Sequence, residues 1–504
     1  MRSTTLRSSI ALLALTTALA MSVPATAQPK ITEAPGPLAP RPFQVPEVQM
    51  ATLSNGLGVA VLTNDEVPMV WVRLVFNAGS WTDPPGQEGL ASAAMDMLDE
   101  GAGSMDAMTL SAAKRRLASR LATYAYLDGA AISASSLKDN LEPTLDLLAA
   151  VLREPTFPES EWELMRSRRL LELLENEEHP TQLCYRALDR VLYGDGYDGR
   201  FATEESYARI GTAEMRAWVE QNLHPANALL LVGGDTTVAE IVPLLESRLA
   251  SWHAREPVGV PSPAVFQPQQ TVLFLMDKPD APQSVIGFGR FAARRTHPDY
   301  TDLYLGNTVL GGIFTSRINL NLREDKGWTY GARSSVYPSH APGQWLMVSS
   351  VDRDATADAV AEVLAEVRAV GSDRPVTAEE LEFGRSNRVH SYPAQFEQTG
   401  YLLGQVASVW RYGLPDDWIS GRLTRLRAVT LEGANAALTR HLDPDAMVVV
   451  VVGDLSAVRD SLDTLGLPTV DIDRKGNLLT PMPEAEAETE TEAETEAETE
   501  AETE

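Results

Sequence analysis

The sequence of 504 residues contains a single cysteine, Cys184, so no disulfide can form within the chain. Cys184 lies in an apolar-spaced segment, TQLCYRALDRVL, and we expect a small buried hydrophobic residue rather than a reactive thiol. After residue 27 no stretch is long and apolar enough to span a bilayer. The chain also has fewer basic than acidic residues. The formal net charge is −28, and it remains −17 without the eleven glutamates of the C-terminal tail, which argues against nucleic-acid binding.

The first 27 residues have the composition of a secretory signal peptide. Arg2 and Arg7 precede the apolar run IALLALTTALAM, and the triplet at 25–27 offers a cleavage site after Ala27. A single membrane anchor is the less favoured alternative, because the run is short for a bilayer span. We therefore expect a protein that is exported, into the periplasm if the source is a bacterium.

The chain contains an internal duplication. LHPANALLLVGGD (223–235) aligns without a gap on LDPDAMVVVVVGD (442–454), at an offset of 219, and FPESEWELMR (157–166) aligns on VTAEELEFGR (376–385) at the same offset. Two blocks that share one offset indicate two homologous lobes. Hairpin-type strands mixed with amphipathic helices predict an α+β lobe, in which one sheet carries a helical layer. The predicted organisation is a signal peptide (1–27), a proline-rich arm (28–46), an N-terminal lobe (47–255), a linker (256–269), a C-terminal lobe (270–470) and a disordered acidic tail (471–504).

Residues 310–334, LGGIFTSRINLNLREDKGWTYGARS, predict a helix that is interrupted near its glycine pair and ends at Gly327, followed by a strand from Trp328. Arg323 falls in the last helical turn, and Tyr330 lies just past the glycine turn. Both side chains can donate hydrogen bonds to peptide carbonyls, and arginine can stabilise a developing oxyanion. The spacing alone leaves open that Arg323 pairs with a surface carboxylate and that Tyr330 packs at the edge of the core.

The pattern LGG-x-F-x-S-R, LRE and G-x-x-Y in this segment resembles the C-terminal lobe of the M16 (insulinase/pitrilysin, mitochondrial-processing-peptidase-like) metallopeptidases. The segments LSNGLGVAVLTND and VRLVFNAGSWTDPPGQEGLA resemble the first lobe of the same family, and the resemblance extends from about residue 47 to residue 470. It implies two homologous lobes, each a mostly antiparallel sheet with a helical layer, arranged as a half-clamshell.

In that family the helix after GLA carries His-x-x-Glu-His, whose histidines bind zinc and whose glutamate activates water, and a further glutamate follows downstream. The matching positions of this chain hold Ser92, Met95 and Asp96, and the downstream position falls on Glu172. None of the seven histidines forms a pair at helical spacing. The resemblance therefore implies no metal and no cofactor in this chain, with Glu172 as a possible surviving ligand position.

The resemblance further implies a division of labour. In two-subunit M16 systems one subunit supplies zinc and the water-activating glutamate, and the other supplies an arginine and a tyrosine that bind substrate. Arg323 and Tyr330 match that pair, so we predict a non-catalytic, substrate-binding subunit of a periplasmic zinc peptidase. Its partner is an HxxEH-bearing subunit that holds the zinc. The substrate is an unfolded peptide added to a sheet edge, for which residues 121–137 are a candidate strand.

Two other functions remain open at this point. One is a non-enzymatic scaffold or peptide-binding protein with the same fold. The other, less favoured, is an autonomous peptidase that uses Asp96, Asp99 and Glu100, although carboxylates suit Mg²⁺ or Ca²⁺ better than a hydrolytic zinc. Arg317 is either a second substrate contact or a salt bridge, and Trp328 either lines the cleft or is buried.

Overall fold

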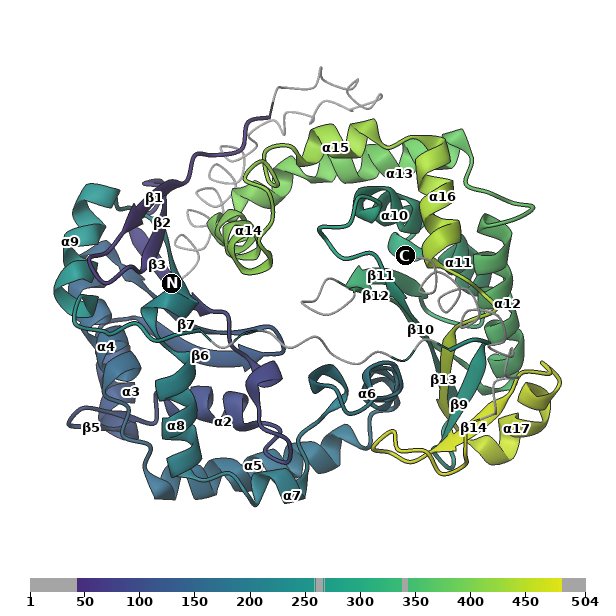
Figure 1. Cartoon of the computed structure of the whole chain (residues 1–504), viewed down its shortest axis with the longest axis horizontal. Helices are drawn as coiled ribbons and strands as arrows, with labels where there is room; N and C mark the ends of the chain where they lie inside the picture. The colour runs from purple at the N-terminus through teal and green to yellow at the C-terminus, as the bar shows by residue number, and fades with distance from the viewer. Residues whose placement is uncertain (1–42, 258, 260–265, 267, 338–342, 483–504) are drawn as a thin grey trace, which may run out of the picture. The chain divides into compact units, whose positions relative to one another are not determined.

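The computed structural model describes residues 43–257, 259, 266, 268–337 and 343–482. The predicted signal peptide, most of the proline-rich arm, part of the linker and residues 483–504 of the acidic tail lie outside the described residues. The predicted start of a disordered tail at residue 471 is wrong, because residues 471 and 472 belong to a strand that pairs with the second sheet. Two six-stranded sheets form the frame of the described part (Figure 1). No helix in this part is both long enough and apolar enough to cross a membrane.

The first sheet has the strand order β1-β2-β8-β3-β7-β6. Its strands are β1 (Gln49–Thr52), β2 (Gly58–Thr63), β3 (Met69–Phe76), β6 (Arg120–Tyr126), β7 (Gly129–Leu137) and β8 (Ala228–Gly234). β1 and β2 form the predicted hairpin, and Gly56 in its turn has a φ of +88°, a value that favours glycine. β6 lies at the edge of the sheet, which confirms that the 121–137 segment contains an edge strand.

The second sheet has the order β11-β12-β10-β13-β9-β14 and repeats five strands of the first; its sixth strand, β14, is parallel to β9, whereas β1 is antiparallel to β2. Its strands are β9 (Val272–Asp277), β10 (Gln283–Ala292), β11 (Arg333–Tyr337), β12 (Gly343–Asp352), β13 (Val448–Gly453) and β14 (Thr469–Ile472). β8 and β13 occupy the same place, each parallel to one neighbour and antiparallel to the other. The predicted duplication and the mostly antiparallel α+β lobes are confirmed.

Helices of its own half lie on one side of each sheet, some in contact with the strands and others packed on those helices. In the first half these are α2 (Leu90–Met97), α3 (Ala107–Arg116), α4 (Leu141–Arg153), α5 (Glu159–Asn176), α7 (Glu204–Tyr207), α8 (Thr212–Asn222) and α9 (Val238–Leu249). In the second half they are α10 (Tyr300–Asn307), α11 (Arg317–Asn319), α12 (Thr356–Val370), α13 (Ala378–Ser391), α15 (Arg422–Ala428), α16 (Leu431–His441) and α17 (Leu455–Asp463). Strand alternation divides the two faces. Val59 and Val61 of β2 pack into the core under the first set, while Ala60 and Leu62 point to the other face.

The other face of each sheet receives a helix from the opposite half. α6 (Pro180–Tyr193) packs on β10 and β13, and α14 (Thr399–Tyr412) packs on β2 and β8. The two helices occupy equivalent places in the duplication, so this is a reciprocal exchange. Cys184 of α6 is fully buried against Gly287, where a Cβ atom would lie 2.4 Å from its sulfur. Burial raises the pKa of the Cys184 thiol, which confirms the predicted inert core residue.

A buried carboxyl makes the stability of the fold depend on pH. Asp198, in a short turn after α6, is 5% exposed. Burial, with repulsion from Asp128 and Asp189, raises its pKa to about 8. A carboxyl with a raised folded-state pKa penalises folding once it ionises, so this contribution lowers the free energy of unfolding between about pH 4 and pH 8.

We expect Asp198→Asn to flatten that fall because it removes the buried charge. The gain is about 1 kcal/mol or more at pH 8.5, with little change at pH 5, as measured by urea unfolding. Asp195→Asn is the matched control, because the Asp195 side chain is 93% exposed and forms only an exposed pair with Arg190. An equal effect of Asp198→Asn at both pH values would contradict this assignment.

Candidate functional site

The helix that corresponds to the predicted metal-binding segment is α2, and its start is firmly held. The carboxylate of Asp83 accepts the backbone N–H groups of Gly89 and Ala91, both at 2.8 Å. Gly89 has a φ of +96° and lies against Tyr207, where a Cβ atom would approach the ring to 2.9 Å. Only glycine suits that conformation and contact, which sets the direction of α2.

Ser92 and Asp96 lie one turn apart on the half-buried face of α2, and a single arginine joins them. Arg169 of α5, which is 9% exposed, donates to Ser92 Oγ at 3.1 Å and forms an ion pair with Asp96. Its other terminal nitrogen donates to the hydroxyl of Tyr207 at 3.2 Å. The guanidinium therefore bridges the two positions at which the resemblance places the histidine ligands of zinc.

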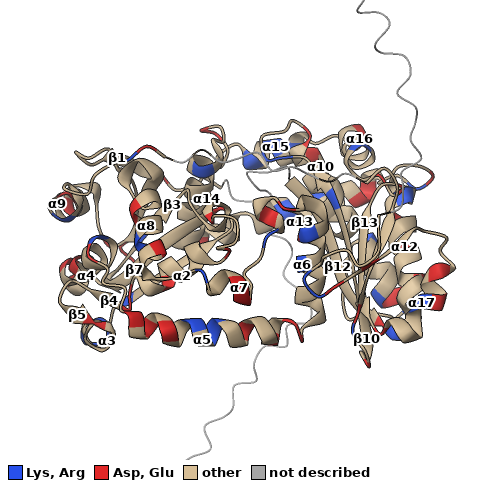
Figure 2. Ribbon diagram, turned by 60° about the horizontal axis from the view of Figure 1, so that its bottom comes forward, with Lys and Arg blue, Asp and Glu red and all other residues tan. Residues whose placement is uncertain are grey.

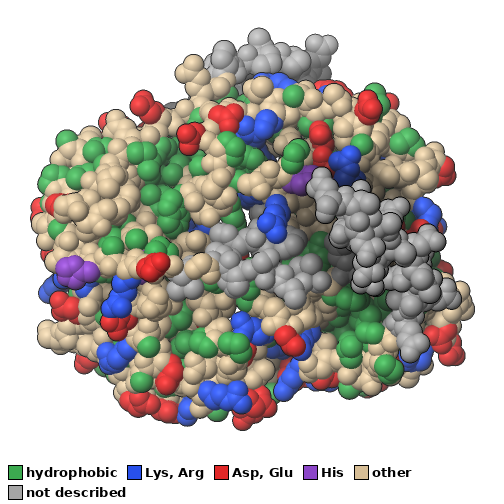
Figure 3. Space-filling model, viewed as in Figure 1, with side chains coloured by type: hydrophobic (Ala, Val, Ile, Leu, Met, Phe, Trp, Pro, Cys, Tyr) green, Lys and Arg blue, Asp and Glu red, His purple; other side chains and the backbone are tan. Residues whose placement is uncertain are grey.

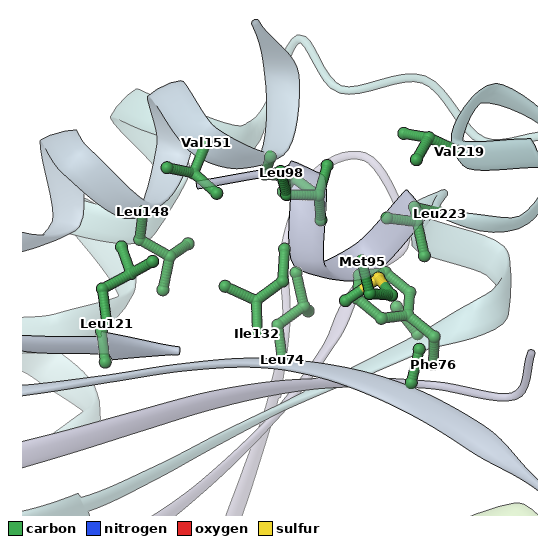
Figure 4. Packing of buried hydrophobic residues seen from close by; sticks show 14 of the residues in the cluster. Leu74, Phe76, Met95, Leu98, Leu121, Ile132, Leu148, Val151, Val219 and Leu223 are labelled. Atoms are coloured by element: carbon green, nitrogen blue, oxygen red, sulfur yellow. The ribbon is translucent and has the colours of Figure 1, made fainter. Parts of the chain in front are cut away.

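These residues do not fit a zinc ion. A hydroxyl and one carboxylate replace the imidazoles, and the cation of Arg169 already satisfies both groups. Met95, at the position of the water-activating glutamate, is fully buried in the same hydrophobic cluster as Phe76 (Figure 4). Glu172, the possible surviving ligand, is exposed on α5 one turn beyond Arg169.

The carboxylate alternative also fails. Asp99 pairs with Lys114 at 2.8 Å, and Asp96 is held by Arg169. Burial raises the pKa of Glu100, which disfavours its charged, metal-binding form. Among the described residues, these carboxylates do not gather within ligand distance of one another. The group that does is His297, Asp299 and His441, elsewhere in the fold.

Arg169→Met is expected to lower the free energy of unfolding by about 2 kcal/mol at pH 7, because it leaves the Asp96 carboxylate without its charged donor. Burial raises the pKa of Asp96, and Arg169 opposes that rise. Without Arg169 the carboxyl is penalised only when ionised, so the loss should be smaller at pH 4 than at pH 7. Arg166→Met on the same helix removes only an exposed pair with Glu163 and should cost less than about 0.5 kcal/mol. Equal losses in the two variants would contradict the bridging role.

The second candidate segment is a helix that breaks where predicted. After α10 come two wide π-helical turns, η5 (Thr308–Gly312) and η6 (Leu320–Asp325), with a break between them. Arg323 lies on η6. Its guanidinium stands 4.5 Å from the ring centroid of Phe314 and 2.7 Å from the carboxylate of Glu324. Arg323 thus has the surface carboxylate partner that the sequence left open, although an exposed pair of this kind is weak.

Tyr330 is 94% exposed, so packing at the core edge is excluded. The turn that presents it is anchored on both sides. The hydroxyl of Thr329 hydrogen-bonds to Ser349 Oγ of β12 at 2.9 Å and accepts the N–H of Gly331 at 3.1 Å. This turn corrects the prediction of a strand from residue 328, because β11 begins only at residue 333.

One residue that no sequence motif singles out connects these segments. Asn319 is 3% exposed, donates to the carbonyl of Phe314 at 2.6 Å and accepts the N–H of Ala332 at 2.9 Å. It therefore links the aromatic ring under Arg323 to the turn that carries Tyr330. In the described part of the chain no hydrogen bond joins Arg323 to Tyr330 directly. The only sequence signal was an asparagine at a helix break.

Two lesser candidates have structural roles. Arg317 forms a bidentate salt bridge with Glu380, at 2.8 and 2.7 Å, and this pairing lowers the pKa of Glu380 to about 2. The salt-bridge interpretation of Arg317 is therefore confirmed. Trp328 is partly buried against the core of the second half.

Two family profiles match successive parts of the chain. The family profile described as "Peptidase M16 inactive domain" matches residues 209–387, and that described as "Insulinase (Peptidase family M16)" matches residues 59–199. An "Uncharacterized zinc protease YmxG" of Bacillus subtilis is 22% identical over 402 residues, covering 78% of this chain and 95% of the relative. A "Non-peptidase homolog YmxG" of Helicobacter pylori is 21% identical over 397 residues, covering 78% and 90%. The crystal structure of a peptidase M16 inactive domain from Pseudomonas fluorescens is 25% identical, with a TM-score of 0.74, covering 81% of this chain and 98% of that one.

Proposed function

Because this chain belongs to the M16 peptidase family, we propose that it is the non-catalytic, substrate-binding subunit of an exported two-subunit zinc peptidase. Its partner is a subunit with an intact HxxEH motif, which supplies zinc and the water-activating glutamate. This chain supplies Arg323 and Tyr330, whose donors bind the backbone of an unfolded peptide near the bond to be cut.

One observation carries the proposal. Tyr330 is almost fully exposed on an anchored turn next to the Arg323 segment. In the same chain, Arg169 occupies the place where a catalytic M16 subunit would bind its metal. An exposed tyrosine held in this way has no role in the stability of the chain, since its ring buries nothing. A function in binding explains why the turn is anchored.

Other features of the surface support a protein partner and a peptide rather than nucleic acid. Leu164, Leu171 and Leu174 are exposed on α5, at spacings that place them on one side of the helix, among its acidic and basic residues (Figure 2). Basic side chains on the face seen in Figure 3 are scattered among acidic and hydrophobic ones. The edge strand β6 offers unpaired backbone groups to an extended peptide.

The test compares this chain, without its signal peptide, alone and mixed with an exported HxxEH-bearing M16 subunit from the same source. We expect a complex in size-exclusion chromatography with light scattering, and cleavage of a fluorogenic unfolded peptide only in the mixture. A complex whose activity equals that of the partner alone would support a scaffold instead. Cleavage of the peptide by this chain alone would overturn the proposal.

A further inference from the structure

The fold brings together two histidines and an aspartate that lie far apart in the sequence. His297 and Asp299 immediately precede α10, and His441 is the last residue of α16, which packs against α10 (Figure 1). Their ligand atoms all lie within 4.8 Å of one another. The Asp299 Oδ2 atom is 3.1 Å from His441 Nε2 and 3.9 Å from His297 Nδ1, and the two imidazole rings are T-shaped with centroids 5.3 Å apart.

We propose that His297, Asp299 and His441 form a binding site for a first-row divalent cation such as Zn²⁺. A metal about 2.0–2.1 Å from each ligand in tetrahedral geometry separates the ligand atoms by about 3.3 Å, and the two observed separations lie on either side of that value. Two imidazoles and one carboxylate are the donor set that zinc and its neighbours in the first transition row prefer, with water in the remaining position.

Two existing contacts compete with the metal. The guanidinium of Arg440 forms an ion pair with Asp299, and the N–H of Asp299 is donated to His297 Nδ1 at 3.1 Å. Both contacts can be replaced by metal ligation at a small cost in free energy. The side chain of Arg440 is 60% exposed and the ring of His297 is 43% exposed, so the first can swing into solvent and the second can turn. A cation already sits on this carboxylate, and a divalent ion with two nitrogen ligands would replace it.

The site is separate from the α2–α5 region, and the inference does not rest on the proposed function. It joins the start of α10 to the end of α16. α10 continues into η5, where Gly311 allows β11 to approach so closely that a Cβ atom would lie 2.2 Å from Ser334 Oγ. A bound metal would therefore brace the helix that leads to the Arg323 segment.

The chain without its signal peptide, stripped with EDTA, is titrated with ZnCl₂ by calorimetry and with Co²⁺ by visible absorption. We expect one ion per chain, cobalt bands typical of a four-coordinate site, and a rise of Tm with zinc. His297→Gln and His441→Gln should each weaken zinc binding at least about tenfold. Arg440→Gln should strengthen it, because it removes the competing cation.

The matched controls are His253→Gln and His390→Gln, which alter exposed histidines elsewhere. Circular dichroism checks that each variant folds. If His441→Gln does not fold, Arg440→Gln still tests the site. Zinc binding that the control substitutions weaken as much as His297→Gln would show surface binding only and overturn the proposal. So would the absence of stoichiometric zinc binding, or Arg440→Gln having no effect on affinity.

Discussion

If the proposed two-subunit peptidase forms, replacing Arg323 by alanine should lower its kcat/KM by about 10²–10³, the usual loss when one preorganised donor to a developing oxyanion is removed. Tyr330→Ala should have an effect of the same order, and Tyr330→Phe separates loss of the hydroxyl from loss of the ring. None of these three substitutions should lower the Tm of the chain. The Tyr330 ring is exposed, and the pair of Arg323 with Glu324 is of the surface type, worth at most about 1 kcal/mol.

The control for Arg323 is Arg368→Ala. Arg368 lies on α12, is half-exposed and has a comparable surface partner in Asp445, so it matches the charge and the exposed pairing of Arg323 at a distant place in the sequence. Activity is measured with a fluorogenic unfolded peptide, and complex formation with light scattering. If the Arg323, Tyr330 and Arg368 variants cleave equally well while the complex still forms, the segment does not touch the substrate and the scaffold function is favoured.

The repeated parts of the fold were predictable because a duplication leaves a direct trace. One offset placed β8 and β13, and the same offset relates α5 and α13, whose first residues are 159 and 378. The exchange of α6 and α14 was not predictable. The apolar side of a helix has the same spacing whichever sheet receives it, so the sequence of α6 does not state that it covers β10 and β13.

In the candidate site, too, some features could be predicted from the sequence and others could not. The absence of zinc ligands followed from residue types at Ser92, Met95 and Asp96, which the sequence displays directly. The role of Arg169 did not, because its partners lie 77 and 73 residues away and many arginines occur on exposed helices. Likewise, His297 and His441 show no pairing at helical spacing, and only the packing of α10 on α16 brings them within reach.

Met95→Glu, the change that would restore the water-activating residue of the lost motif, should lower the free energy of unfolding by at least about 4 kcal/mol at pH 7. Met95 is 0% exposed and belongs to the hydrophobic core that also contains Phe76 and Leu74, so a carboxylate at this position would be buried among apolar side chains (Figure 4). The same position in an active site must face water and metal. Here it faces the interior of the core.

The size of this effect should depend on pH, and that dependence identifies its cause. Burial raises the pKa of an introduced glutamate above its unfolded value of about 4.3, so its charge penalty is absent below that value and grows as the pH rises through the folded-state pKa. Urea unfolding should therefore show a smaller loss at pH 4 than at pH 7. Met95→Leu, which keeps volume and polarity, should cost less than about 1.5 kcal/mol at either pH. A loss of the same small size for glutamate would mean that the Met95 side chain can reach solvent, and that restoring the zinc motif requires only its two histidines and the removal of Arg169.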